Sequence, residues 1–128
     1  MEHIAVEQLS RVAELKDRPV TLSRRERLER WAEALERGPY RPLRSLGEIE
    51  WQPEAHRPLM RADGSALSVA YEDPVLRDAG MASDCLGDAM RFFELSEQEM
   101  HAILCSCVYG GISRADVTAR MVRSVSRG

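Results

Sequence analysis

Apolar residues recur every three or four positions through much of this chain, which is the spacing of one face of an α-helix. The clearest such stretch begins at Ser23, where Glu26 three residues later completes the pattern of a capping box. We expect it to end at Gly38-Pro39, because proline cannot continue a helix. The apolar face of this predicted helix consists of Leu28, Trp31, Ala32 and Leu35.

The same spacing predicts five further helices. Apolar residues from Ile4 to Leu15 form a short helical pattern, which Pro19 ends because a proline disfavours the helical conformation of the residue before it. In the second half of the chain, Asp73-Pro74 offers an N-cap followed by proline, and Ser96 with Glu99 forms another capping box. The helices of this half are expected at about residues 74–79, 85–94, 97–108 and 113–127. The last of them is expected to begin at Ser113, which is followed by Asp116 three residues later, much as Ser96 is followed by Glu99.

The middle of the chain, residues 39–74, contains five of the six prolines and has poor helical periodicity. Ile49 and Trp51 alternate with polar neighbours, and the stretch from Leu67 to Tyr71 alternates similarly, which is the period of a half-buried strand. Asp63-Gly64 between them suits a turn. We therefore expect a mainly α protein: a single small helical domain spanning residues 1–128, with about six helices and at most a short two-stranded β element in this segment.

Composition favours a compact, water-soluble protein. Of the 128 residues, 44% are hydrophobic and 30% are charged, which is far from the composition of disordered chains. No run approaches the roughly 18 consecutive apolar residues of a membrane span. Glu2 and Glu7 make the start unlike a secretory signal, so we expect a cytoplasmic location.

The cysteines and arginines add two smaller points. Cys85, Cys105 and Cys107 are odd in number and not spaced as a secreted disulfide framework, which favours free thiols in a reducing compartment. Seventeen arginines against one lysine point to a bacterial genome of high GC content and imply no particular activity.

Charge is unevenly distributed, although the net charge is only −3. Residues 11–44 have a balance of +4, residues 45–107 one of −8, and residues 108–128 one of +3. The densest basic cluster lies between Arg24 and Arg30, interleaved with glutamates. This pattern predicts either a surface for a charged partner or pairing of opposite charges within the fold. On the last predicted helix, Val117, Met121, Val122 and Val125 are expected to face inward and Arg120, Arg123 and Arg127 outward.

Common catalytic motifs are missing from the sequence. The single lysine, Lys16, does not follow a glycine-rich phosphate-binding loop. Neither a dinucleotide-binding glycine pattern, a G-x-S-x-G elbow nor an H-E-x-x-H zinc motif occurs, and Asp63-Gly64 lacks the carboxylates of a calcium loop. We therefore assign no catalytic residue, metal ligand or cofactor and expect a protein that is not an enzyme.

His101, Cys105 and Cys107 form the densest group of metal-ligand residue types. On one helix His101 and Cys105 share a face, whereas Cys105 and Cys107 project about 160° apart and cannot close on one zinc ion. Cys107 falls with the apolar stripe of Met100, Ile103 and Leu104, so it is expected in the core. A metal or thiol site that uses His101 and Cys105 stays an open alternative, and further ligands would have to come from His3, His56 or Cys85.

A second alternative is a DNA-binding helix-turn-helix formed by the predicted helices 85–94 and 97–108. The residues that would meet the DNA first are Glu97, Gln98 and Glu99, after Glu94. Carboxylates repel phosphates, so nucleic acid is a disfavoured partner. The leading expectation is a small protein that binds another protein or itself through its acidic middle and basic ends.

Overall fold

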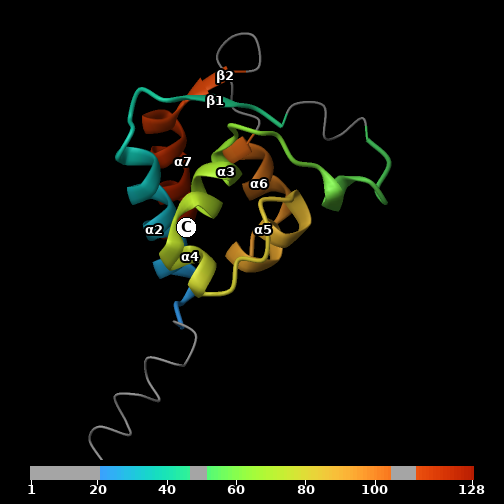
Figure 1. The fold of residues 1–128 in the computed structure, drawn as a ribbon, viewed down its shortest axis with the longest axis horizontal. Coiled ribbons are helices and arrows are strands. Elements are labelled where there is room, and N and C mark those ends of the chain that lie inside the picture. Colours follow the sequence, from blue (N-terminus) through green and yellow to red (C-terminus); the bar gives the residue numbers. More distant parts are fainter. Residues whose placement is uncertain (1–20, 47–51, 105–111) are drawn as a thin grey trace, which may run out of the picture.

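The computed structural model describes residues 21–46, 52–104 and 112–128, and helices dominate this part of the chain (Figure 1). The expected mainly helical fold class with a short two-stranded sheet is confirmed. The α-helices are α2 (Arg24–Glu36), α3 (Ala66–Glu72), α4 (Pro74–Asp78), α5 (Leu86–Phe93), α6 (Glu97–Leu104) and α7 (Ala115–Arg127); the 3-10 helix is η2 (Arg57–Leu59) and the strands are β1 (Pro42–Arg44) and β2 (Ile112–Arg114).

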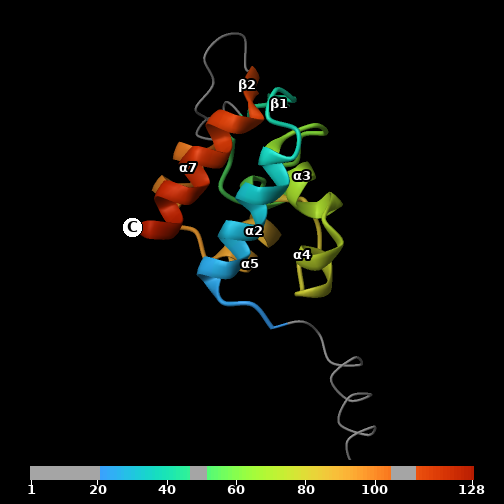
Figure 2. The ribbon, with the colours of Figure 1, turned by 90° about the vertical axis from the view of Figure 1, so that its left-hand side faces the viewer.

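Helix α2 is the central element, and it contacts α3, α4, α5 and α7. Helix α7 lies along α2 in both views (Figures 1 and 2). The Ala115 N–H at the start of α7 donates to the Arg41 carbonyl oxygen at 3.0 Å, just beyond the end of α2. The two helices therefore run antiparallel, with the small sheet at one end of the pair (Figure 2).

Trp31 on α2 is the centre of the core and is fully buried. Its indole stacks on the Phe93 ring, with 4.5 Å between the ring centroids and an interplanar angle of 20°. Its Nε1–H donates to the Ala66 carbonyl oxygen at 2.9 Å, which satisfies the one polar atom of the side chain. A single side chain thus joins α2, α3 and α5. Other fully buried residues around it are Leu28, Leu35, Leu67, Leu76 and Val122.

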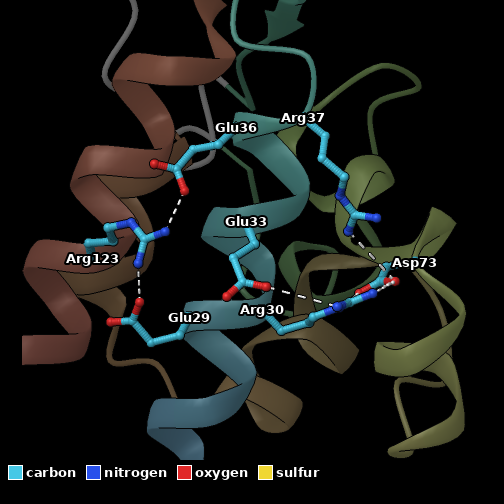
Figure 3. A network of polar contacts seen from close by, with 7 residues as sticks. All are labelled: Glu29, Arg30, Glu33, Glu36, Arg37, Asp73 and Arg123. Carbon is cyan, nitrogen blue, oxygen red and sulfur yellow. Dashed lines mark hydrogen bonds and ion pairs between the residues drawn. The ribbon is translucent and has the colours of Figure 1, made fainter.

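Helix α2 is also held by ionic contacts on two sides (Figure 3). On one side, the Arg123 guanidinium from α7 pairs with Glu29 and Glu36. The expectation that Arg123 faces solvent is wrong, because these two carboxylates lie opposite it on α2 and draw it inward. Val122 is buried as expected, whereas Val117, Met121 and Val125 are only half-buried.

On the other side of α2, Arg30 reaches Asp73 at the junction of α3 and α4 (Figure 3). Its Nε and Nη2 donate to the two carboxylate oxygens at 2.7 Å and 3.0 Å, the paired geometry that suits a guanidinium. Asp73 was expected to cap α4. The helix does start after it at Pro74, but the Asp73 carboxylate makes no capping hydrogen bond there.

The capping boxes at Ser23 and Ser96 are confirmed, with reciprocal bonds to Glu26 and Glu99. Ser113 is not the N-cap of the last helix, because it lies in β2 and the cap position is Arg114. Residues 1–20, which carry the first predicted helix, lie outside the described residues.

The strand prediction for the middle segment is wrong in its position. Leu67 to Tyr71 belongs to α3, where the buried positions 66, 67, 69 and 70 form one helical face. In so short a helix, the apolar residues at 67, 69 and 71 also match the two-residue period of a strand. Asp63-Gly64 does form a turn, with φ +80° at Gly64, but the turn leads into this helix. The observed sheet pairs β1 antiparallel with β2, with Leu43 opposite Ser113. Ile49 and Trp51 lie outside the described residues.

Candidate functional site

An open cavity of about 730 Å³ lies between η2, α5 and α6, and we call it the α5–α6 groove. This volume falls within the roughly 300–1,000 Å³ that is typical of ligand pockets. Leu86 and Met100 are almost fully buried and form its floor, while Met90 is half-buried and Pro58 is exposed. Its polar lining residues are Glu54, Arg57, Glu97, Gln98 and His101.

The wall formed by η2 is fixed to α5 by local contacts. The Leu86 N–H, which has no partner inside its own helix, donates to the Met60 carbonyl oxygen at 2.8 Å. Arg61 pairs with the buried Asp84 just before α5, with 3.1 Å between Nε and Oδ1. The groove is therefore bounded by elements that hold each other in place.

Gly87 permits a close approach of η2 to α5. A Cβ atom at this position would lie 2.7 Å from the Pro58 Cβ, which is closer than real Cβ contacts allow, and 3.1 Å from the Pro58 backbone oxygen. Glycine is needed here for space, because Gly87 lies within α5 and has helical backbone geometry.

Replacing Gly87 with alanine is therefore expected to push η2 off α5 and to widen the groove. We expect a loss of about 1–3 kcal/mol in the free energy of unfolding, the usual cost of overpacking, measured by urea denaturation. Chemical shifts of η2 residues should change most. Ala89→Gly on the buried face of the same helix serves as a control, because it should destabilise α5 without moving η2. A Gly87→Ala protein with unchanged η2 signals would contradict this account.

The orientation of α6 is set at its first turn. The Ser96 N–H donates to Glu99 Oε1 at 2.9 Å, and the Glu99 N–H donates to Ser96 Oγ at 3.1 Å. Arg24 from α2 donates to Glu99 Oε2 at 2.8 Å and to the Glu94 carbonyl oxygen at 3.1 Å. The bond from the Ser96 backbone lowers the pKa of Glu99 most; burial opposes that shift, and the Ser96 hydroxyl and Arg24 add to it. Glu99 is thus a structural carboxylate.

Glu54 and Glu97 at the rim of the groove differ from Glu99. Within the described residues, neither carboxylate has an ion pair or a hydrogen bond. Leu59, at the end of η2 beside Pro58, is 73% exposed, although it is large and apolar. The groove therefore combines an apolar floor with two carboxylates that have no partner in the described residues and with the cation of Arg57, while the exposed Leu59 follows the lining residue Pro58 in the chain.

Of the predicted His and Cys residues, the structure describes His56, Cys85 and His101. His101 lies on the exposed face of α6 and lines the groove, whereas Met100, Ile103 and Leu104 are buried as the apolar stripe predicts. Cys105, Cys107 and His3 lie outside the described residues, so the proposed His101/Cys105 pair is untested. His56 is exposed and Cys85 is half-buried. Across residues 21–46, 52–104 and 112–128, no group of three or more His, Cys, Asp or Glu side chains could hold a metal ion.

The spacing of α5 and α6 does match a helix-turn-helix, with a three-residue connection at 94–96. Glu94 ends α5 in the left-handed conformation, at φ 51° and ψ 51°, where glycine is the usual residue. The first exposed residues of α6 are Glu97 and Gln98. Arg123 is already paired with glutamates of α2, which removes one of the cations that would contact phosphate.

Three of the four arginines in the basic cluster of α2 contact other parts of the fold, whereas Arg25 is exposed. Arg24 and Arg30 pair with Glu99 and Asp73. Arg27 donates from Nη1 to the Phe92 carbonyl oxygen at 2.7 Å, and its guanidinium lies 4.5 Å from the Phe92 ring centroid. Pairing within the fold, one of the two predicted explanations of the charge pattern, thus applies to these arginines.

A second cavity, of about 390 Å³, lies beside the end of α2. Its charged lining groups already pair: Arg41 with Glu72 in a double hydrogen bond, and Asp73 with Arg30. Arg37 lies 3.9 Å from Asp73 at the edge of the same network. An anionic ligand would have to displace these carboxylates, so this cavity is the weaker candidate site.

Comparison of the chain with protein-family models, with curated proteins and with solved structures found no match. Among the described residues, none of the helices is long and apolar enough to cross a bilayer. The α5–α6 groove is therefore the strongest candidate functional site among the described residues. Sequence reasoning missed this groove; the available signals were Gly87 within a helix and the exposed Pro58-Leu59 pair.

Proposed function

We propose that this chain is a protein-interaction module, without catalytic activity of its own, that receives a segment of a partner protein in the α5–α6 groove. The observation that supports the proposal most is the combination of an open apolar groove with unpaired glutamates at its rim. Two methionines in the lining add adaptable apolar surface of the kind that peptide-binding proteins use. We place the protein in the bacterial cytoplasm as part of the same proposal.

DNA binding through α5 and α6 is supported less well. The helix-turn-helix spacing favours it, but the helix that would enter the major groove begins with Glu97 and Gln98. Phosphate contacts supply most of the affinity for DNA, and they require exposed cations at this surface. A protein segment, in contrast, can carry cations of its own to these carboxylates.

The proposal is tested by site-specific photo-crosslinking in the native cells. A benzophenone side chain at Gln98, which is exposed and lines the groove, should give a discrete protein adduct. The same group at exposed Asp78 on α4 should not give this adduct, since Asp78 is not part of the groove. Adding Leu59→Asp or Met90→Asp should reduce the Gln98 adduct at least about tenfold, as expected for apolar anchor positions.

Two results would count against an interaction module. Equal adducts from Gln98 and Asp78 would show that the groove has no special role. A shift of random duplex DNA at low salt, lost on Arg120→Glu and unaffected by Leu59→Asp, would favour the helix-turn-helix function instead. Circular dichroism of each variant confirms that it is folded, which is expected because Leu59 is 73% exposed.

A further inference from the structure

Internal pairing neutralises most carboxylates of the described residues but leaves charge at the α5–α6 groove. Glu54 and Glu97 line this groove without a partner in the described part of the chain. Arg57 is a cation in the same lining, and its Nε–H donates to the Gln52 carbonyl oxygen at 3.0 Å, so the two carboxylates outnumber it. Among the described carboxylates of the middle segment that have no ion pair, Glu54 and Glu97 line the groove, whereas Asp78 lies apart from it on α4. The carboxylates of the described residues that do pair with arginine are Glu29, Glu33, Glu36, Asp63, Glu72, Asp73, Asp84, Asp88, Glu99 and Asp116.

From this distribution we infer the chemistry of the occupant: a basic amphipathic helix of a partner protein. This inference rests on the proposed function. Apolar side chains of the helix contact Leu86, Met90 and Met100 on the floor, and its lysines or arginines pair with Glu54 and Glu97 on the rim. Binding an amphipathic helix in a groove between helices is a common mode of peptide recognition.

The groove is preformed, which favours a short partner segment as its occupant. Its two walls are η2 and α6, and both are anchored before any partner arrives, through Met60 and Arg61 on one side and Arg24 on the other. A preformed groove lowers the ordering cost of binding, so a short segment suffices for measurable affinity.

A second copy of this chain is a poorer occupant. Its exposed arginines in the described residues include Arg25, Arg120 and Arg127, which lie on α2 and α7. The apolar faces of these two helices are buried against each other and the core, at Leu28, Trp31 and Val122 among others. On α2 and α7 the exposed cations therefore have no fully exposed apolar side chain beside them. The exposed ring of Tyr40, outside these helices, already lies 5.5 Å from the Arg114 guanidinium.

The test uses the full-length protein and two designed 18-residue helical peptides of the same apolar pattern, one of leucine and lysine and one of leucine and glutamate. Fluorescence anisotropy at physiological salt measures affinity, and nitrogen-15 chemical shifts locate the contact. We expect the lysine peptide to bind at least about tenfold more tightly than the glutamate peptide, with shifts at Gly87, Met90 and Gln98.

Charge-reversal variants distinguish the effect of the groove carboxylates on peptide binding from the effect of the net charge of the protein. Glu97→Lys should weaken binding of the lysine peptide about five- to tenfold, since a nearby pair is replaced by repulsion. Asp78→Lys makes the same change of charge on α4 and should weaken it less than about twofold. Equal effects of the two variants, shifts outside the groove, or binding of neither peptide would overturn the inference.

Other outcomes decide between this inference and the proposed function. Groove shifts from the glutamate peptide as strong as those from the lysine peptide would reject the basic occupant and leave a protein-binding groove in place. Concentration-dependent self-association in light scattering, lost on Glu97→Lys, would identify a second copy as the occupant and reject the partner helix. The crosslinking result at Gln98 does not depend on either peptide, so the two proposals can fail separately.

Discussion

Replacing Trp31 with alanine is expected to destabilise the protein by about 4 kcal/mol, within the range measured for truncating large buried aromatic residues. Trp31 is fully buried, it stacks on Phe93, and its indole N–H is the hydrogen-bond partner of the Ala66 carbonyl oxygen. The variant loses this apolar contact and leaves a buried oxygen without that partner. Domains of this size have a free energy of unfolding of roughly 5–15 kcal/mol, so the substitution removes a large part of the total stability.

The measurement is urea and thermal unfolding followed by far-ultraviolet circular dichroism, with a decrease in Tm of about 15 °C expected. Trp31→Phe is the matched control, because it keeps an aromatic ring beside Phe93 and removes the bond to Ala66. It should cost less than half as much as the alanine variant. A Trp31→Ala protein within about 1 kcal/mol of the wild type would show that Trp31 is not the centre of the core.

The helices that could be predicted are those whose signals are local. Ser23 with Glu26 and Ser96 with Glu99 lie three residues apart, and each pair forms its capping box through contacts within one turn. Helix α3 was missed because a seven-residue helix spans only two turns, too few to separate a helical period from an alternating one. Strand β2 was missed because its partner β1 lies about 70 residues earlier.

The groove could not be predicted because it depends on contacts between distant segments. Its lining residues come from segments 54–58, 86–90 and 97–101. Gly87 indicates a close contact between the first two segments only when the positions of both in the fold are known. The sequence also could not show which glutamate at the start of α6 lacks a partner, because Glu97 and Glu99 are both glutamates of the same helical turn. Glu99 is paired by Arg24, 75 residues away, and Glu97 is not.

Replacing Arg30 with alanine is the second change with a large expected effect. Asp73 is 4% exposed, and both of its carboxylate oxygens accept hydrogen bonds from Arg30. Without Arg30, the buried charge keeps only Arg37 at 3.9 Å. Breaking a buried pair costs about 3–5 kcal/mol, and partial exposure of Arg30 reduces this to an expected loss of about 2–3 kcal/mol at pH 7.

The pH dependence of this loss tests its cause. Burial raises the pKa of the Asp73 carboxyl, but the hydrogen bonds and charge of Arg30 lower the pKa by more, with smaller contributions from the Val75 backbone and then Arg37. In the wild type the stabilisation is therefore complete above the unfolded pKa of about 3.9 and disappears as the pH falls through the lower folded value. In Arg30→Ala only the Val75 backbone and Arg37 still oppose the effect of burial, so the pKa of the Asp73 carboxyl is higher and it binds a proton at higher pH.

We therefore expect the stability difference between the wild type and Arg30→Ala, from urea unfolding, to be largest near pH 7 and to shrink steadily as the pH is lowered toward 3. The double variant Arg30→Ala/Asp73→Asn removes the buried charge together with its partner. It should recover part of the loss at pH 7 and should lack the pH-dependent part of the effect, because no carboxyl titrates at this position. A loss in Arg30→Ala that stays constant from pH 7 to pH 3 would mean that Arg30 stabilises the junction of α3 and α4 by packing of its aliphatic stem, and that the charge of Asp73 contributes little.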